Sequence, residues 1–223
     1  MTIQAVVFDA YGTLLDVHSA MRRHAGRLGA DWQGLSAQWR SKQVEYSWVR
    51  SLVGPGAHRD FGRLTDEALA YVAAVNGISD AGLLAELRLA YRELSAYPEV
   101  PAMLAALREA GTARGILSNG EPGMLAQGVR AAGIDGLLDA VLSVESVGVF
   151  KPDRRVYGLA VERFGVAADR IAFVSSNPWD AFGAREYGCR VFWCNRAGLP
   201  DEYGLRATVV ELADLADLPA RLA

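Results

Sequence analysis

The sequence predicts an α/β fold in which a Rossmann-like parallel sheet is covered by helices and carries a helical insertion. Six short apolar runs rich in β-branched residues are typical of buried strands; they cover residues 3–9, 113–118, 140–144, 171–175, 190–194 and 207–210. Helical patterns lie between the later runs, at residues 102–110, 124–132, 153–164 and 179–187. Strands and helices that alternate at these lengths indicate a parallel sheet with helices on both faces.

The first run departs from this alternation. After Asp16 no further strand pattern appears until residue 113, and residues 17–96 carry apolar positions at helical spacing, such as Leu35, Trp39 and Tyr46. A loop-like stretch at 52–56 separates two of these helices. Pro98 and Pro101 mark the return of the chain, because the residue before a proline is driven out of the helical conformation. We therefore expect a helical subdomain inserted just after the first strand.

Glycines bound the later helices. Each of the four helical patterns is followed by one, at Gly111, Gly133, Gly165 and Gly188. A glycine adopts the left-handed conformation that commonly closes a helix at little steric cost. These positions therefore predict where the helices end.

Composition limits the class of protein. The chain has 223 residues, 51% of them hydrophobic and 22% charged, which is enough to bury a sizeable core. A formal net charge of -3 argues against a general nucleic-acid binder, which would show a basic excess. No secretory signal pattern and no run approaching the roughly 18 apolar residues of a membrane span is visible, so a cytoplasmic protein is expected. Cys189 and Cys194 are interpreted as buried free thiols.

Polar residues gather at the ends of four predicted strands, in the stretches 9–13, 118–120, 151–152 and 175–180. Each stretch alone has an ordinary explanation, because Asp, Asn, Ser and Gly are the usual residues of turns and helix caps. Four such stretches at the carboxyl ends of different strands are harder to explain this way. Ligands bind at that edge of an open α/β sheet, so the pattern predicts an active site there.

In order and approximate spacing these stretches resemble the motifs of the haloacid dehalogenase superfamily. Residues 8–14, 117–120, 150–157 and 173–180 are most similar to its L-2-haloacid dehalogenase branch. The resemblance implies a Rossmann-like core formed by residues 1–15 and 98–223, with a helical cap formed by residues 16–97. It also implies a homodimer.

Two departures from the phosphatases of this superfamily indicate the dehalogenase branch. Those phosphatases usually carry a second Asp two residues after the first, which protonates the leaving oxygen, and here Tyr11 stands in its place. A halide leaves without a proton, so this loss is tolerable for dehalogenation. Ser176 likewise replaces the first acid of the last motif, and Mg²⁺ prefers several anionic oxygens. We therefore expect no essential metal and no cofactor.

The residues themselves indicate a reaction through an ester. Asp9 is the candidate nucleophile, because a carboxylate can displace halide from the carbon next to a carboxyl group. Asp180 is the candidate base that activates water to hydrolyse the ester. Lys151 would keep both carboxylates ionised, since like charges at short range raise a pKa. Thr13 and Ser175 would orient the carboxylates, although each could equally be an ordinary helix cap.

The substrate carboxylate is expected to bind near the first two motifs. Ser118 and Asn119, together with nearby backbone N–H groups, are the candidates, with a simple turn as the alternative. By resemblance the turn that contains Ala10 and Tyr11 also contacts the substrate.

The leaving halide needs a site that tolerates a developing anion. Arg40 matches the cap arginine that contacts the halide in the family; without the resemblance it would be read as a solvated helix residue. Asn177 and Trp179 would complete the pocket with N–H donors or a positive ring edge, and Asn177 is also a candidate to assist in hydrolysing the ester. Tyr157 would reach the carboxylates through its hydroxyl, or would simply be a half-buried helix residue.

The expected reaction is hydrolysis of short 2-haloalkanoic acids, such as haloacetates and 2-halopropionates, to 2-hydroxy acids and halide, with inversion. The resemblance implies that the (S)-acids are the substrates and the (R)-2-hydroxy acids the products. A phosphatase or phosphonate hydrolase on the same fold is the alternative reaction. A catalytically idle binding or dimerisation module is the third possibility. The near-complete polar set argues against it, because unused buried charges are costly to retain.

Overall fold

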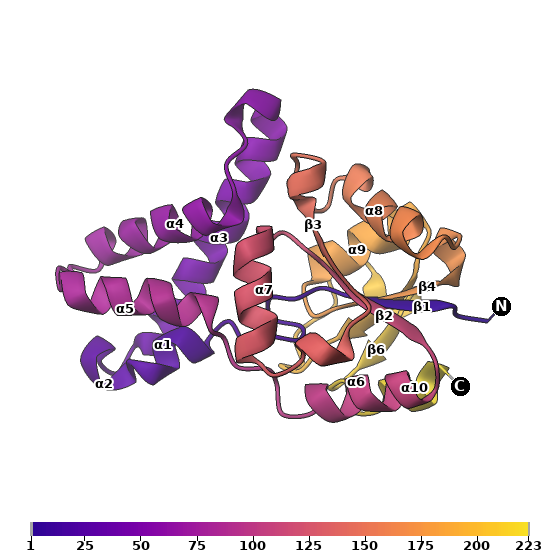
Figure 1. The fold of residues 1–223 in the computed structure, drawn as a ribbon. Helices are drawn as coiled ribbons and strands as arrows, with labels where there is room; N and C mark the ends of the chain where they lie inside the picture. The colour runs from indigo at the N-terminus through magenta and orange to yellow at the C-terminus, as the bar shows by residue number, and fades with distance from the viewer. Residues whose placement is uncertain (1, 223) are drawn as a thin grey trace.

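The computed structural model describes residues 2–222, and in them six strands form one parallel sheet (Figure 1). The strands are β1 (Ala5–Phe8), β2 (Ala113–Ser118), β3 (Ala140–Ser143), β4 (Ile171–Ser175), β5 (Arg190–Cys194) and β6 (Val210–Leu212). Their order in the sheet is β3-β2-β1-β4-β5-β6. β1 is therefore central, with Phe8 opposite Ile116 of β2 and Val174 of β4. The predicted α/β fold is confirmed.

The order of the strands creates a crevice at one edge of the sheet. From β1 the chain builds the sheet toward β2 and β3 on one side, and later toward β4, β5 and β6 on the other. The reversal lies between β1 and β4, and at such a point the connections leave in opposite directions and open a site at the carboxyl ends of the strands. All four residues of β1 are fully buried, which explains its continuous apolar sequence.

Helices cover both faces of the sheet. They are α6 (Val100–Glu109), α7 (Pro122–Ala131), α8 (Arg154–Phe164), α9 (Pro178–Tyr187) and α10 (Leu218–Leu222). Figure 1 shows α8 and α9 on one face of the sheet, and α6 and α10 on the other. Short 3-10 helices complete the connections: η2 (Asp135–Leu137), η3 (Val144–Ser146), η4 (Ala168–Arg170) and η5 (Leu205–Ala207).

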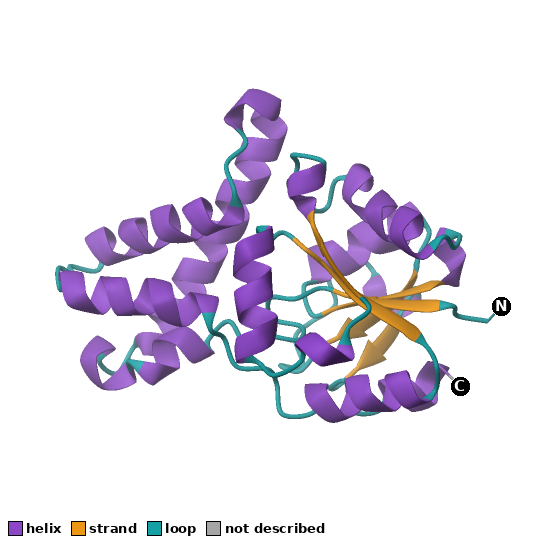
Figure 2. Ribbon diagram, in the orientation of Figure 1, coloured by secondary structure: helices purple, strands orange, loops and turns teal. Residues whose placement is uncertain are grey.

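The stretch between β1 and α6 is helical and stands beside the sheet (Figure 2). It contains α1 (Ser19–Arg23), α2 (Ala25–Leu28), α3 (Trp32–Val53), η1 (Pro55–Ala57), α4 (Phe61–Val75) and α5 (Ala81–Arg92). The chain enters and leaves it through two adjacent segments. Leu15 and Ala96 form an antiparallel bridge, and the Tyr97 N–H donates to the Leu14 carbonyl at 3.0 Å. The functional division into a core and a closing cap, with limits at residues 16 and 97, stays a prediction.

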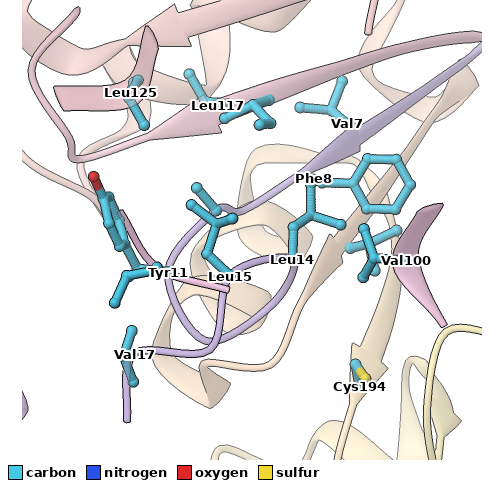
Figure 3. Close-up of a cluster of buried hydrophobic side chains, with 14 of the residues drawn as sticks. Val7, Phe8, Tyr11, Leu14, Leu15, Val17, Val100, Leu117, Leu125 and Cys194 are labelled. Atoms are coloured by element: carbon cyan, nitrogen blue, oxygen red, sulfur yellow. The ribbon is translucent and has the colours of Figure 1, made fainter. Parts of the chain in front are cut away.

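The turn that follows β1 is part of the core. Figure 3 shows Leu14 and Leu15 of this turn beside Phe8 of β1 and Val100 of α6, and all four side chains are buried. Because these apolar side chains pack the turn against the core, the polar residues of the turn are held in place at the sheet edge.

The structure corrects several element boundaries. The strand expected at 207–210 is largely wrong, because Ala207 ends η5 and the Thr208 N–H donates to the Leu205 carbonyl at 2.8 Å, so β6 begins only at Val210. The first strand spans Ala5–Phe8 rather than 3–9, and residues 52–53, expected in a loop, belong to α3. The four glycines expected at helix ends all have positive φ, from +67° to +115°.

Candidate active site

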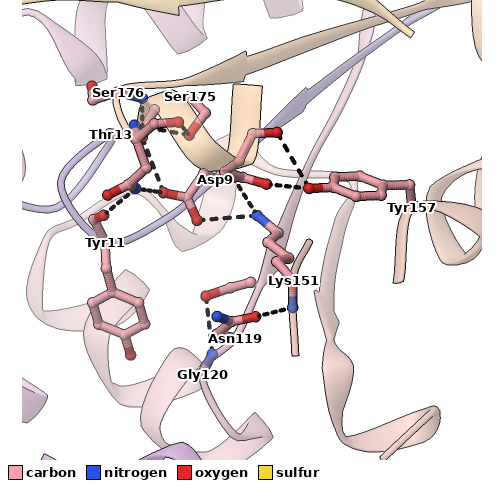
Figure 4. Close-up of polar contacts among 12 residues, drawn as sticks. Asp9, Tyr11, Thr13, Asn119, Gly120, Lys151, Tyr157, Ser175 and Ser176 are labelled. Atoms are coloured by element: carbon pink, nitrogen blue, oxygen red, sulfur yellow. Dashed lines mark hydrogen bonds and ion pairs between the residues drawn. The ribbon is translucent and has the colours of Figure 1, made fainter. Parts of the chain in front are cut away.

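Asp9 lies directly after β1, and hydrogen bonds fix both its backbone and its side chain. Its N–H donates to the Val174 carbonyl of β4 at 2.9 Å, and only 4% of the residue is exposed. Side-chain Oδ2 accepts hydrogen bonds from Asn177 Nδ2 at 2.7 Å and from Thr13 Oγ1 at 3.1 Å (Figure 4). Oδ1 accepts one from Lys151 Nζ at 3.1 Å. Three side-chain donors thus leave the carboxylate little freedom to rotate.

Thr13 connects the first motif to the last. While its Oγ1 donates to Asp9, the same oxygen accepts the Ser176 N–H at 2.8 Å. Thr13 can reach back to Asp9 because Gly12 turns the chain with φ of +90°. The hydroxyl is therefore oriented by a backbone donor rather than free to rotate.

Lys151 places a positive charge between two carboxylates. Its ammonium lies 3.1 Å from Asp9 Oδ1 and 2.9 Å from Asp180 Oδ2, and the residue is fully buried. Burial alone would lower the pKa of Lys151, but the negative charges of Asp180 and Asp9 outweigh it and raise the pKa above its usual value. The ammonium is therefore charged throughout the neutral pH range.

Asp180 lies in the first turn of α9 and is fully buried. Its Oδ1 accepts a hydrogen bond from the Tyr157 hydroxyl of α8 at 2.8 Å. Burial raises the pKa of Asp180, and the charge of Asp9 adds to the rise; the charge of Lys151 and the Tyr157 hydroxyl oppose it. A carboxyl with a raised pKa is a stronger base once ionised, which suits it to accept a proton.

Tyr157 remains a hydrogen-bond donor. Burial, together with the neighbouring Asp180 charge, raises the pKa of its hydroxyl well above the usual value. Its space depends on Gly183 of α9, since a Cβ there would overlap the Tyr157 hydroxyl and lie 2.6 Å from Pro152 Cβ. The packing of α8 on α9 therefore determines where this hydroxyl lies.

Tyr11 turns its ring away from the carboxylates (Figure 4). The ring packs against Phe61 of α4 and Tyr91 of α5, with centroids 5.6 and 5.9 Å away. Its carbonyl instead faces the site, where it accepts from Asn177 Nδ2 at 3.2 Å and Arg40 Nη2 at 3.3 Å. Burial raises the pKa of the Tyr11 hydroxyl well above its usual value, so this phenol stays protonated at neutral pH.

The helical part contributes Arg40 from α3. The half-buried guanidinium also lies 3.4 Å from Asn177 Oδ1, so it bridges the first and last motifs. Trp179 lies nearby and packs edge-on against Trp48 of α3, at 5.4 Å between centroids. Both indoles line an apolar cavity of about 510 Å³ together with Phe150.

Several candidate residues hydrogen-bond to the turns of the site and contact neither Asp9 nor Asp180. The Ser175 hydroxyl accepts the Asn177 N–H at 3.1 Å. This local hydrogen bond replaces the expected contact between Ser175 and a carboxylate. Ser118 Oγ accepts the Gly120 N–H at 3.1 Å, and Asn119 Oδ1 accepts the Lys151 N–H at 3.0 Å. The Ala10 carbonyl accepts the N–H groups of residues 13, 14 and 15. The structure thus brings Asp9, Lys151 and Asp180 together and gives the other residues supporting places.

One residue at this edge was missed by the sequence analysis. Arg196 follows β5 and donates to the carbonyls of Gly12 and Thr13. The signal that could have found it is its position: it stands just after the 190–194 strand, at the same edge as the other motifs. An arginine after a strand is so common at protein surfaces that this position alone predicted nothing.

The remaining expectations concern metals, thiols and membranes. Within residues 2–222, no group of three or more His, Cys, Asp or Glu side chains is placed to hold a metal ion. Cys189 and Cys194 are free and buried, and burial raises the pKa of Cys189 to about 12. Over the same residues, every helix is too short or too polar to span a membrane.

Comparisons with known proteins agree on one family. Residues 3–188 match the family model described as haloacid dehalogenase-like hydrolase. The chain is 44% identical to (S)-2-haloacid dehalogenase 4A of Burkholderia cepacia over 218 residues, which cover 97% of this chain and 94% of that protein.

Solved structures give the same result. A dehalogenase crystallised with an intermediate complex superposes with a TM-score of 0.96 at 43% identity, covering 100% of this chain and 98% of that one. The L-2-haloacid dehalogenase of Xanthobacter autotrophicus, with chloropropionic acid covalently bound, superposes with a TM-score of 0.88 at 37% identity and 98% coverage of both chains.

Proposed function

Because the chain belongs to the haloacid dehalogenase-like hydrolases, we propose that it hydrolyses short (S)-2-haloalkanoic acids to (R)-2-hydroxy acids and halide. The observation that carries this proposal is the ammonium of Lys151, buried between Asp9 and Asp180 at 3.1 and 2.9 Å. It leaves one carboxylate ionised as a nucleophile and the other ionised as a base. Relatives that act on (S)-2-haloacids, 44% identical in the case given above, support the substrate class.

The first step is displacement of the halide by Asp9. Oδ2 accepts two side-chain hydrogen bonds and Oδ1 only one, so Oδ1 keeps the freer lone pair for attack. Its electron pair forms a bond to C2 of the substrate while the carbon–halogen bond breaks, and X⁻ leaves with the bonding pair. Attack from the side opposite the halogen inverts C2.

The substrate must be oriented for this attack. Arg40 Nη2 lies 3.3 Å from the Tyr11 carbonyl and 3.4 Å from Asn177 Oδ1, and in this proposal its positive charge beside the Asn177 amide receives the departing halide. Ser118 and Asn119, with the backbone N–H groups of their turn, bind the substrate carboxylate in this proposal. Orientation of this kind is worth several orders of magnitude in rate when the reacting atoms are held in near-attack geometry.

The second step frees the enzyme. A water molecule attacks the carbonyl carbon of the Asp9 ester and passes one proton to Asp180. The ester C–O bond then breaks, and the 2-hydroxy acid leaves with the oxygen that Asp9 supplied, which takes the proton back from Asp180. The water oxygen remains in the Asp9 carboxyl group, whose proton passes to solvent. In the tetrahedral intermediate the negative charge lies on Oδ2, which accepts from Asn177 and Thr13, and Lys151 stabilises the charge that develops on Oδ1 as it leaves with the product.

The same contacts argue against a phosphatase. The position where a leaving oxygen would need an acid is occupied by Tyr11, whose ring packs among aromatic residues of α4 and α5. Ser176 stands where the phosphatases carry the first acid of the last motif, so the site offers a divalent cation one anionic oxygen donor fewer. No metal and no cofactor enter the proposed reaction.

The reaction class is tested by halide release from the two enantiomers of 2-chloropropionate in the presence of EDTA. The proposal expects turnover of the (S)-enantiomer, unchanged by chelator, and (R)-lactate as product. Mg²⁺-dependent cleavage of a phosphate ester without halide release would favour the phosphatase. Halide release that is unchanged in Asp9→Asn would contradict the role of Asp9, and absence of both activities in the wild type would favour the idle module.

We further propose that the enzyme is a cytoplasmic homodimer. Val49, Leu52 and Val53 expose an apolar surface at the end of α3, and Leu52 is 87% exposed. An exposed apolar patch on a surface helix is typical of a protein–protein contact. The two free cysteines suit a reducing compartment, where thiols persist.

A further inference from the structure

Arg196 reaches from the end of β5 into the turn that carries Asp9. Its Nη2 donates to the Thr13 carbonyl at 3.0 Å, and its Nη1 donates to the Gly12 carbonyl at 3.3 Å. The same Nη1 lies 3.1 Å from Ser176 Oγ in the last motif. One guanidinium thus joins the two loops that supply the hydrogen bonds to the nucleophile.

The other edge of the guanidinium faces the segment that returns from the helical part. Glu99 Oε1 accepts hydrogen bonds from Nε at 3.0 Å and Nη2 at 2.6 Å, and the Tyr97 ring centroid lies 3.8 Å from the guanidinium carbon. Tyr97 also donates its N–H to the Leu14 carbonyl. Arg196 therefore touches both segments through which the chain passes between the sheet and helices α1–α5.

The geometry needs an arginine. Five contacts run in different directions within the guanidinium plane, and the Tyr97 ring stacks on its face. A lysine ammonium is a single point charge that cannot form this fork or stack in the same way. The side chains of Arg196 and Glu99 are 20% and 17% exposed, so water replaces only part of what a substitution removes.

We infer that Arg196 is a positioning residue for the nucleophile. It holds the turn that carries Asp9 against residues 97–99, the segment that returns from helices α1–α5. It acts through Thr13: while the Thr13 carbonyl is fixed by Arg196, its hydroxyl donates to Asp9 Oδ2. The Ser176 contact steadies the residue whose N–H orients that hydroxyl. The inference rests on the proposed function, because halide release is its readout.

The test compares Arg196→Lys and Arg196→Ala with the wild type on (S)-2-chloropropionate. Both variants are expected to lower kcat by about ten- to a hundred-fold, since small misplacements of a reacting group cost this much. KM is expected to change less than threefold, because the residue does not contact the substrate site. Guanidinium ion at non-denaturing concentration should restore part of the kcat of Arg196→Ala and none in wild type.

Arg206→Ala is the matched control. Arg206 also forms a fork to a carboxylate, Glu211, and donates to the Leu199 carbonyl, but none of its partners belongs to the site. Its loss should leave kcat unchanged. A second comparison uses a Thr13→Ala background, in which Arg196→Ala should cost much less than in the wild type, because the route through Thr13 is already lost.

Other outcomes overturn the inference. They are an unchanged kcat in folded Arg196→Lys and Arg196→Ala, or a higher KM at unchanged kcat. An equal loss of kcat on Arg196→Ala in the wild type and in the Thr13→Ala background would also overturn it. So would a loss of activity that matches the loss of folded protein in thermal unfolding and is not rescued by guanidinium. Absence of halide release by the wild type would instead contradict the proposed function.

Discussion

Lys151, Asp9 and Asp180 form a buried triad in which one ammonium forms ion pairs with two carboxylates. Removing the ammonium would leave two like charges in a buried site, and one of them would take up a proton. The remaining polar contacts decide how the charge is shared. Asn177 and Thr13 donate hydrogen bonds to Asp9, and the Tyr157 hydroxyl stabilises ionised Asp180.

Tyr157→Phe tests this division at a single atom. The Tyr157 hydroxyl opposes the rise in the pKa of Asp180, so its loss should raise that pKa further. Asp180 must be ionised to act as a base, hence activity is lost as the pH falls through its pKa. The acid limb of kcat should therefore move to higher pH, because the variant lacks the hydrogen bond that favours ionised Asp180.

Tyr187→Phe provides the control for this experiment. Tyr187 packs beside Tyr157, with 5.8 Å between ring centroids. It is the last residue of α9, the helix whose first turn contains Asp180. Its loss should leave the acid limb in place. An acid limb that stays put in Tyr157→Phe, or moves equally in both variants, would show that Tyr157 does not set the pKa of Asp180.

At this scale the sequence located the charged residues but not all their partners. Asp9, Lys151 and Asp180 were predictable as neighbours because strands of a parallel sheet end at one edge. The partner of Ser175 was not, since its hydroxyl bonds the N–H of Asn177 two residues later. Such local bonds depend on the dihedral angles of the loop, which residue types alone leave open.

Among the elements, α9 carries two functions. Its first turn presents Asp180, and its middle makes room at Gly183 for the Tyr157 hydroxyl of α8. Two helices that pack this closely need a residue without a side chain at the crossing. The position of the base therefore depends on packing between helices as well as on the loop before α9.

Gly183→Ala tests this dependence. The added methyl would push on Tyr157 and Pro152, so we expect a loss of stability of about 1–3 kcal/mol, as for other overpacked cores. We also expect lower kcat, because the Tyr157 hydroxyl moves away from Asp180. Thermal or urea unfolding and halide release measure the two effects.

Gly26→Ala is the comparison for Gly183→Ala. Gly26 lies on exposed α2 with nothing within 4 Å of an added Cβ, so the substitution should be neutral or stabilise by up to about 1 kcal/mol. If both substitutions behave alike, close packing at the α8–α9 contact does not place Tyr157.

Element boundaries show what sequence patterns can and cannot locate. Glycines marked four helix ends correctly, because each has the positive φ that favours glycine. Three helix starts were predicted one or two residues late, since α6, α7 and α9 each include a proline in their first turn. Proline is compatible with that position although it breaks a helix interior, and apolar periodicity alone does not tell the two apart.

For the whole molecule, the sheet order explains how residues 9 and 180 meet. β1 lies beside β4, and the connections that follow them open a crevice between the two. The alternation of strands and helices predicted this architecture. The approach of α3 over the crevice was not predictable from residues alone, because it depends on the angle at which the helical part packs.

The proposed dimer is a prediction at the same scale. The chain has a mass of 24.0 kDa, and light scattering should give about twice this value. A variant that combines Leu52→Lys and Val53→Lys should be monomeric, because two charges would face an apolar contact. Leu89→Lys, on exposed α5, should leave the dimer intact. A monomeric wild type would contradict the dimer, and a dimeric double variant would place the contact elsewhere.

The central claim is that the substrate becomes esterified to Asp9, and an oxygen label tests it most directly. Enzyme in excess over (S)-2-chloropropionate is allowed a single turnover in H₂¹⁸O, and the product and the peptide that contains Asp9 are weighed by mass spectrometry. The ester route predicts unlabelled lactate and one ¹⁸O atom in the Asp9 carboxylate. Labelled lactate from an unlabelled protein would mean that water attacks the substrate carbon directly, and would contradict the account.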